Sequence, residues 1–339
     1  MNRREWLKLR ASSSGVALRE NIDAFHQKFP KQPAMGTETA SAYSTRGIYA
    51  NDKERGHVSD YDVNKPDYAA TAEQWWSFYA ARPFLAGGFA WTGFDYRGEP
   101  SPYKWPCVNS HFGILDTCGF PKDSFFYYQA WWIGQPVLHL FPHWNWAGKE
   151  GQEIEVWCFS NLDRVELFLN GKSLGSQPVT KNSHLVWKVP YAPGAIEARG
   201  MKALGSGSTT LTAMRETTSA PAKIVLRPDR AKISADGEDV SVVQVDIVDA
   251  QGRVVPTADN EVTFYVTGNA RILGVGNGDP SSHEPDKASA RRAFNGLCMA
   301  IVQSTKEAGE IRIEASSLNL ETATVVVTAQ PVTARPALA

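Results

Sequence analysis

Short apolar runs and helical patterns alternate along the first part of the chain. Apolar residues recur three or four positions apart before Pro30, which is typical of an amphipathic helix that ends at a proline. Two short apolar runs then lead to Glu38 and to Trp91, and each predicts a strand. The helical segment between them begins with a proline, so this part predicts a strand–helix–strand unit. The expected elements are a helix at 19–29, a strand ending at 38, a helix at 66–82, a strand at 84–91 and a helix at 124–133.

After residue 136 the helical patterns give way to alternating apolar and polar residues, with the period of two that strands require. Asn170–Gly171 is a strong hairpin-turn signal between two such runs. The alternating runs lie at 153–159, 164–169, 184–189 and 195–201, and the Gly- and Ser-rich stretch 205–219 contains a last strand and a linker. These patterns predict a small antiparallel β-sandwich.

A second all-β region follows. Its strand candidates lie at 223–226, 240–248, 261–266, 270–275, 293–302, 310–315 and 322–328. Turn signals such as Asp236–Gly237 and Gln251–Gly252 separate them. Seven short strands in roughly 100 residues is the number found in immunoglobulin-like domains. The last residues, 331–339, are rich in Pro and Ala and predict a frayed tail.

Composition separates the two halves of the chain and excludes several partners. All 11 Trp residues fall at or before Trp187, which indicates a change of domain after that residue. The formal net charge of −1 gives no attraction to nucleic acid, and no apolar run is long enough to span a bilayer. The four cysteines show no paired spacing, which favours buried free thiols over a disulfide framework or a metal site.

The two predicted strand ends carry the residues with chemistry. Glu38 follows one apolar run and Trp91 ends the next. Strand C-termini in such units hold catalytic groups, and a carboxylate there can attack or stabilise an anomeric carbon. The indole of Trp91 can pack on the apolar face of a pyranose. A lone Glu is also often a structural salt-bridge partner, and a Trp at a strand end is often a core residue.

Four ordered motifs decide between these interpretations. They read GTETASAYSTRGIY, PFLAGGFAWTGFDYRGEPSPYKWP, NSHFGILDTCGFPKD and LHLFPHWNW. The chain closely resembles the β-galactosidase branch of glycoside hydrolase family 2, from about Glu20 almost to the C-terminus. The resemblance implies retaining hydrolysis of terminal β-D-galactosides, with Glu38 as the catalytic nucleophile. It also implies that Trp91 forms the floor of the galactose pocket.

The resemblance also implies a multidomain fold. A full (β/α)₈ TIM barrel takes about 250 residues, and barely half that number precedes the first sandwich. We therefore expect a partial barrel, consisting of its last two βα units, followed by two immunoglobulin-like β-sandwich domains. The expected domains are an atypical N-terminus at 1–18, the barrel part at 19–135, a β-sandwich at 136–218, an immunoglobulin-like β-sandwich at 219–330 and a tail at 331–339.

The second catalytic group of the family is not visible in the sequence. In that family the general acid/base is a Glu that follows an Asn well upstream, and no Asn–Glu motif precedes Gly36. Asp95, Glu99 and Asp116 lie near the site loops, but nothing marks them as acids. The expectation is a C-terminal portion that lacks its acid/base and hydrolyses little alone. The alternatives are a non-catalytic carbohydrate-binding or scaffold fragment, and one half of a split enzyme whose missing N-terminal portion acts in trans.

Three further residues are substrate-binding candidates. Tyr43 and Arg46 follow the nucleophile motif, and Arg46 either orients Glu38 by a bidentate pair or forms an ordinary loop salt bridge. Asn109 resembles a position that helps to hold a monovalent cation and a sugar hydroxyl in some family members, but a loop-capping role is equally consistent. The sequence requires no cofactor. A monovalent or divalent cation is possible in the complete enzyme.

The first residues resemble a degenerate twin-arginine export signal. Arg3 and Arg4 precede a stretch that is short and Ser-rich where an apolar core is required. An internal deletion that joins a signal start to the last part of an enzyme explains this pattern, and so does a charged helix that matches by chance. A functional signal implies a periplasmic or secreted protein; without one, the protein is expected in the cytoplasm.

Overall fold

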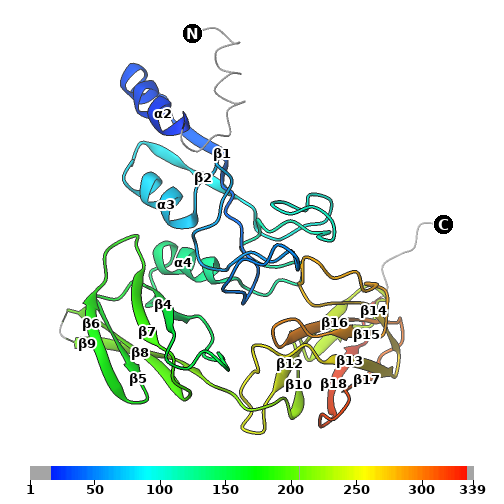
Figure 1. Cartoon of the computed structure of the whole chain (residues 1–339). Helices are drawn as coiled ribbons and strands as arrows, with labels where there is room; N and C mark the ends of the chain where they lie inside the picture. Colours follow the sequence, from blue (N-terminus) through cyan, green and yellow to red (C-terminus); the bar gives the residue numbers. More distant parts are fainter. Residues whose placement is uncertain (1–16, 206, 334–339) are drawn as a thin grey trace. The chain divides into compact units, whose positions relative to one another are not determined.

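The computed structural model describes residues 17–205 and 207–333 (Figure 1). The twin-arginine-like start and most of the expected tail lie outside these residues. The chain divides into two compact units, one up to Thr217 and the other from Thr218 onward. None of the described helices is long and apolar enough to cross a membrane.

The first unit contains three described helices and nine strands. The helices are α2 (Ala17–Lys28), α3 (Ala72–Ala80) and α4 (Asp123–Trp132). The strands are β1 (Ala34–Ala40), β2 (Leu85–Trp91), β3 (Leu138–Phe141), β4 (Glu153–Ser160), β5 (Arg164–Leu169), β6 (Lys172–Pro178), β7 (Leu185–Pro190), β8 (Ala195–Leu204) and β9 (Gly207–Glu216).

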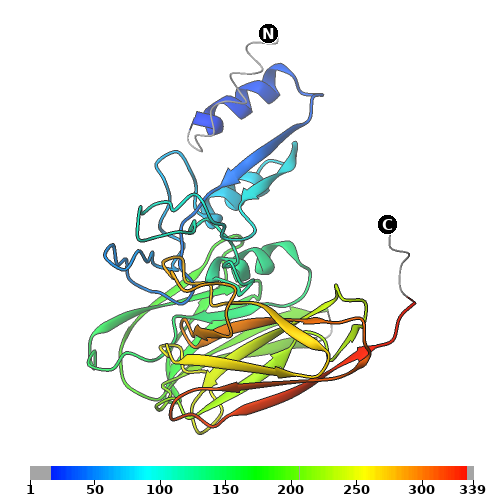
Figure 2. The same ribbon diagram turned by 90° about the vertical axis from the view of Figure 1, so that its right-hand side faces the viewer.

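Strands β1 and β2 form a parallel pair connected through α3. Figure 2 shows the two strands side by side. The connecting helix packs closely on them, because a Cβ atom added at Gly88 would lie 3.1 Å from the ring of Trp75, which is buried in α3. This is the strand–helix–strand unit that the sequence predicts, and its parallel pairing brings both strand C-termini to the same edge.

Helix α3 starts later than its sequence pattern predicts. It begins at Ala72 instead of at residue 66, because Thr71 caps it through a capping box with Gln74. The carboxylate of Asp62 also accepts hydrogen bonds from the backbone N–H groups of Ala72 and Glu73. These acceptors satisfy the free N–H groups of the first turn, so the segment before Thr71 remains a loop.

The remaining strands of the first unit form two facing antiparallel sheets. One sheet has the order β3-β4-β7 and the other the order β6-β5-β8-β9. Side chains from both sheets share one core, which includes Val156 and Trp187 on one side and Leu167 and Ile196 on the other. Helix α4 contributes the buried ring of Tyr127 to a neighbouring aromatic cluster with residues of β3 and β4. The part that contains α4 and the two facing sheets are therefore packed together within one unit.

The second unit is a pair of sheets built from nine strands in the described region. These are β10 (Lys223–Pro228), β11 (Lys232–Ser234), β12 (Val240–Val248), β13 (Glu261–Thr267), β14 (Ala270–Gly276), β15 (Ala290–Arg292), β16 (Leu297–Ser304), β17 (Gly309–Ser316) and β18 (Ala323–Gln330). The sheet orders are β10-β12-β16-β14 and β11-β18-β17-β13-β15. The sequence predicts seven of these strands and misses β11 and β15, which have three residues each.

Strand β16 also starts four residues later than predicted. Asn295 and Gly296 both have positive φ angles, 49° and 84°, and form a turn inside the expected strand. Ala293 lies before that turn and is buried. Its buried apolar side chain therefore fits the sequence pattern of a strand, although β16 itself begins only at Leu297.

Candidate active site

The ends of β1 and β2 bring Glu38 and Trp91 onto neighbouring strands. Thr39 pairs with Ala90 and Ala40 pairs with Trp91 in the parallel ladder. The hydroxyl of Thr39 also donates to the backbone oxygen of Phe89, at 2.8 Å. Glu38 is exposed and Trp91 is 38% exposed, so both side chains are accessible to a ligand. The Trp91–Thr92 peptide bond is cis.

The backbone changes conformation two residues after Glu38, at the end of β1. Ala40 and Ser41 have φ angles of 64° and 65°, a left-handed conformation that is uncommon for residues other than glycine. Both residues are buried, and the backbone oxygen of Ala40 accepts a hydrogen bond from the N–H group of Ala70. Strained backbone of this kind concentrates at functional sites, where the surrounding structure holds it in place.

Trp91 is linked to two polar side chains of the loop that follows it. Its indole Nε1 donates to the hydroxyl of Tyr96 at 3.1 Å, and that hydroxyl donates to Oε2 of Glu99 at 2.5 Å. The rings of Trp91 and Tyr96 also meet edge to face, with centroids 5.8 Å apart. The indole therefore has a fixed orientation, and an exposed carboxylate is tethered beside it.

Burial, together with the charges of Glu38 and Glu99, raises the pKa values of the same two tyrosines, Tyr68 and Tyr96. Burial raises the pKa of Tyr68, and the charges of Glu99 and Glu38 raise it further. Burial, the hydrogen bond to Glu99 and the charges of Glu99 and Glu38 raise the pKa of Tyr96 to about 12. Burial, followed by Tyr68 and Glu99, raises the pKa of Tyr43 to about 12. All three phenols therefore keep their protons at neutral pH and remain hydrogen-bond donors.

Tyr43 also shares a hollow with Trp91. The two side chains line it together with Phe112 and Asp60, and the ring of Tyr43 lies 4.8 Å from that of Phe112. Glu38 lines a second, mostly apolar hollow with side chains of α3 and β2. Tyr43 and Trp91 therefore line one hollow and Glu38 lines another, and Ala40 lines both.

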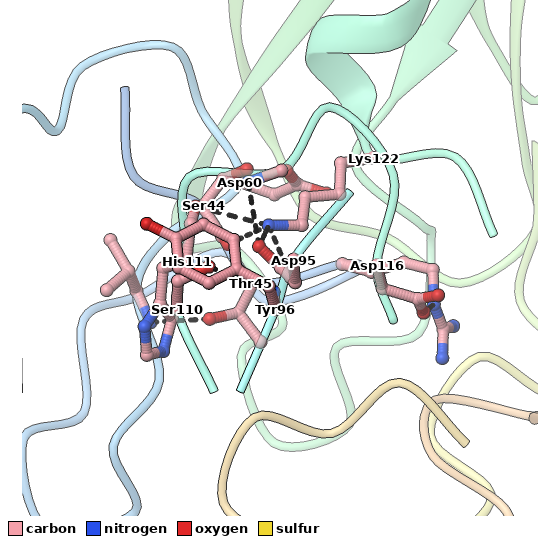
Figure 3. Close-up of polar contacts among 12 residues, drawn as sticks. Ser44, Thr45, Asp60, Asp95, Tyr96, Ser110, His111, Asp116 and Lys122 are labelled. Atoms are coloured by element: carbon pink, nitrogen blue, oxygen red, sulfur yellow. Dashed lines mark hydrogen bonds and ion pairs between the residues drawn. The ribbon is translucent and has the colours of Figure 1, made fainter. Parts of the chain in front are cut away.

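A buried lysine joins several segments of the loop region through hydrogen bonds (Figure 3). Lys122 is completely buried, and its Nζ donates to Oδ1 of Asp95 at 2.9 Å and to the backbone oxygens of Ser44 and His111. Asp95 also accepts a hydrogen bond from the N–H group of Gly113 at 2.7 Å. Burial raises the pKa of Asp95 to about 7, while Lys122 and this hydrogen bond oppose the rise.

Arg46 forms a buried ion pair with Asp116, with Nε 2.6 Å from Oδ2. The other oxygen of Asp116 accepts hydrogen bonds from the backbone N–H groups of Cys118 and Phe120. The guanidinium also lies over the ring of Phe120, 5.0 Å from its centroid. This is the loop salt bridge that the sequence left as one of two roles for Arg46.

Asn109 is 3% exposed, and its Oδ1 has no hydrogen-bond partner in the described part of the chain. An orphaned amide oxygen is a suitable single ligand for a cation or a water molecule. The described residues contain no group of three His, Cys, Asp or Glu side chains that could hold a metal ion. One amide oxygen alone does not form a coordination sphere for a cation.

Sequence reasoning did not assign a role to Tyr68, Tyr96, Glu99 or Lys122 in the site. Tyr96 and Glu99 stand inside the WTGFDYRGEP motif, which is the signal that could have identified them. Tyr68 and Lys122 lie in other segments and reach the site only through the fold. Asp95 and Asp116 are committed to buried ion pairs.

Comparison with known proteins gives one consistent family. The model described as glycoside hydrolase family 2 C-terminal domain 5 matches residues 224–326, and a domain of unknown function matches residues 151–205. β-Galactosidase BoGH2A of Bacteroides ovatus is 39% identical over 322 residues, which cover 89% of this chain and 37% of that protein. A β-glucuronidase of Formosa agariphila is 26% identical over 339 residues, covering 95% of this chain and 33% of that protein.

Solved structures agree with these matches. A β-glycosidase from Bacteroides vulgatus superposes with a TM-score of 0.83 at 33% identity, covering 91% of this chain and 43% of that chain. A β-glucuronidase described as a glycoside hydrolase family 2 enzyme gives a TM-score of 0.72 at 25% identity, covering 89% of this chain and 32% of that chain. The chain spans about a third of the length of the curated relatives above and corresponds to a C-terminal portion of them.

Proposed function

This chain belongs to glycoside hydrolase family 2, and we propose that it carries the nucleophile side of a retaining β-galactosidase active site. The observation that supports this most strongly is the pairing of the two strand ends. Ala40 pairs with Trp91 in the ladder of β1 and β2, and Glu38 lies two residues before Ala40 on β1, which supports one sugar meeting both the carboxylate and the indole face. In the whole enzyme, this part forms the last two units of a (β/α)₈ barrel, followed by two immunoglobulin-like sandwiches.

Terminal β-D-galactosides are the proposed substrates. The Bacteroides ovatus relative is named a β-galactosidase and is 39% identical to this chain, whereas a putative β-glucuronidase and a β-glucuronidase of Formosa agariphila are 31% and 26% identical. The exposed indole of Trp91 suits the apolar face of a galactose ring. The phenols of Tyr43, Tyr68 and Tyr96 supply hydroxyl groups around it.

In the proposed reaction, an oxygen of Glu38 attacks the anomeric carbon as the bond to the leaving group breaks. Water then displaces Glu38 from that carbon and releases galactose with retained configuration. The first step needs a proton donor about 5–5.5 Å from the nucleophile for an ordinary leaving group. Asp95 and Asp116 are buried in ion pairs, and Glu99 accepts a hydrogen bond from Tyr96. We therefore assign the donor to a part of the whole enzyme outside these residues.

An azide-rescue assay tests this assignment of roles. A dinitrophenyl β-D-galactoside has a leaving group that departs without protonation, so Glu38 can form the galactosyl ester without a general acid. Azide can then displace Glu38 without a general base, and the product is β-galactosyl azide. We expect the chain to form this product with added azide, and to hydrolyse a nitrophenyl galactoside at a negligible rate.

The matched variants are Glu38→Gln and Glu153→Gln. Glu153 is an exposed acid at the start of β4, outside the site, so its substitution should leave azide product formation unchanged. Glu38→Gln should abolish it. Equal product from Glu38→Gln and from the unmodified chain contradicts the nucleophile role. Hydrolysis of the nitrophenyl galactoside at the rate of intact relatives contradicts the external proton donor.

A second candidate function is carbohydrate binding without catalysis. The exposure of Trp91 and its fixed orientation favour it, because a sugar platform requires both. Galactoside binding by the chain, without azide product from the dinitrophenyl substrate, supports this function over the first.

A further inference from the structure

We infer that Glu99 sets the charge preference of this site, so that it accepts an uncharged pyranoside and rejects a uronide. A uronide carries a carboxylate in place of the terminal hydroxymethyl group. The inference rests on the proposed function, because it concerns the sugar that Glu38 and Trp91 receive. Glu99 would determine which sugar binds and takes no part in the proposed bond-breaking step.

The first support is the fixed position of the Glu99 carboxylate. Its Oε2 accepts a hydrogen bond from the Tyr96 hydroxyl. That hydroxyl in turn accepts a hydrogen bond from the indole N–H group of Trp91. Two hydrogen bonds therefore connect the carboxylate to the ring on which the sugar is expected to stack. Any sugar on Trp91 lies beside this charge.

The second support is the negative charge that Glu38 and Glu99 share around the described phenols. Glu38 and Glu99 both act on Tyr68 and on Tyr96, so the two carboxylates border the same region. The phenols remain protonated and neutral. Two buried cations of these loops, Lys122 and Arg46, are paired with Asp95 and Asp116.

The chemistry of the two sugar classes then differs. The hydroxyl groups of a neutral pyranoside can donate to Oε1 of Glu99, which has no hydrogen-bond partner in the described part of the chain. A uronide instead brings a third anion next to Glu38 and Glu99. Like charges at such separations repel measurably even in a solvated site, so we expect roughly ten-fold weaker binding of the uronide.

The test compares two ligands on the 339-residue chain. Ligand-observed NMR titrations at neutral pH and low salt give the dissociation constants of methyl β-D-galactoside and of its uronide, methyl β-D-galactosiduronate. We expect about ten-fold weaker binding of the uronide to the unmodified chain. In Glu99→Gln the ratio of the two constants should fall several-fold, because the amide oxygen still accepts from Tyr96 while the charge is removed. Glu153→Gln is the matched control and should keep the original ratio.

A salt series on the unmodified chain gives a second measurement that needs no variant. Charge repulsion at an exposed site is screened, so the preference should shrink as ionic strength rises. An unchanged ratio in a folded Glu99→Gln, or a ratio insensitive to salt, overturns the inference while galactoside binding still supports the sugar site. Tighter binding of the uronide also overturns it. Failure of both ligands to bind overturns the proposed function and the inference with it.

Discussion

Nζ of Lys122 lies 2.8 Å from Oδ2 of Asp95, and at most 3% of either side chain is exposed. Lys122 is the residue immediately before α4, whereas Asp95 belongs to the loop that leaves β2. Tyr96 follows Asp95 directly and holds the indole of Trp91. This buried pair therefore connects the start of α4 to the loop whose Tyr96 hydroxyl accepts the hydrogen bond from Trp91.

Removal of one partner of this pair should be costly. Lys122→Met leaves the carboxylate of Asp95 buried without its cation, and we expect the free energy of unfolding to fall by about 3–5 kcal/mol. The double variant Lys122→Met/Asp95→Asn removes the charge as well and should recover part of the loss. Urea unfolding followed by tryptophan fluorescence measures this in the first unit alone, because no Trp lies beyond Trp187. A double variant less stable than the single one would contradict this account.

Gly113 should tolerate no side chain. A Cβ atom there would lie 2.1 Å from the backbone nitrogen of Asp95 and 2.2 Å from the backbone oxygen of Leu115. Gly113→Ala should therefore displace the loop and destabilise the first unit by on the order of 2 kcal/mol or more. Gly134→Ala is the matched control, since its Cβ would meet nothing within 4 Å. Equal urea midpoints for the two variants would show that the loop is less constrained than we describe.

The contribution of Asp60 to the stability of the first unit should decrease as the pH rises. Burial, with the neighbouring Asp123 carboxyl, raises the pKa of Asp60 from 3.8 to about 8. The folded state then holds a proton that the unfolded state has lost, so this contribution is complete below about pH 4 and is lost as the pH approaches 8. Burial raises the pKa of Asp123 to about 7, which acts in the same direction.

Asp60→Asn isolates this effect. The amide cannot ionise, so the variant should gain stability relative to the unmodified chain between pH 5 and pH 9, by on the order of a few kcal/mol. Part of the pH dependence should remain because of Asp123. Urea unfolding at several pH values, read by tryptophan fluorescence, gives the slopes, and Glu153→Gln serves as an exposed control. Parallel slopes for Asp60→Asn and the unmodified chain would refute the buried-proton interpretation.

Trp91→Ala should weaken galactoside binding without unfolding the chain. The side chain is 38% exposed, so its loss removes a ligand surface more than a core contact. We expect at least about a ten-fold rise in the dissociation constant, because the stacking face and the Tyr96 hydrogen bond are both lost. Trp132→Phe, on the partly exposed end of α4, is the control. Unchanged binding by a folded Trp91→Ala would remove the platform role.

Local patterns predicted the strands around the site. The short apolar runs before Glu38 and Trp91 predict two strands, and β1 and β2 form there, although β1 continues two residues past Glu38 to Ala40. The start of α3 was wrong because a capping box at Thr71 and the distant carboxylate of Asp62 decide it, and neither is part of the apolar period. The three-residue strands β11 and β15 are too short to show a period.

The ion pairs near the site could not be predicted from local sequence patterns. Arg46 and Asp116 are 70 residues apart, and the Lys122–Asp95 contact spans 27 residues. Spacing along a strand or helix predicts neither contact, because the fold as a whole brings these segments together. By contrast, Tyr96 and Glu99 follow Trp91 within eight positions, so a closer inspection of that motif could have identified them.

Covalent trapping is the most direct test of the central claim that Glu38 is the attacking carboxylate. A fluorosugar analogue of galactose with a dinitrophenyl leaving group forms the glycosyl ester and hydrolyses slowly, so the labelled protein can be digested and its peptides mapped by mass spectrometry. We predict a single added fluorogalactosyl group on the peptide that contains Glu38, and none in Glu38→Gln. A label on Glu99 or on any other carboxylate, with Glu38 unmodified, would contradict the account.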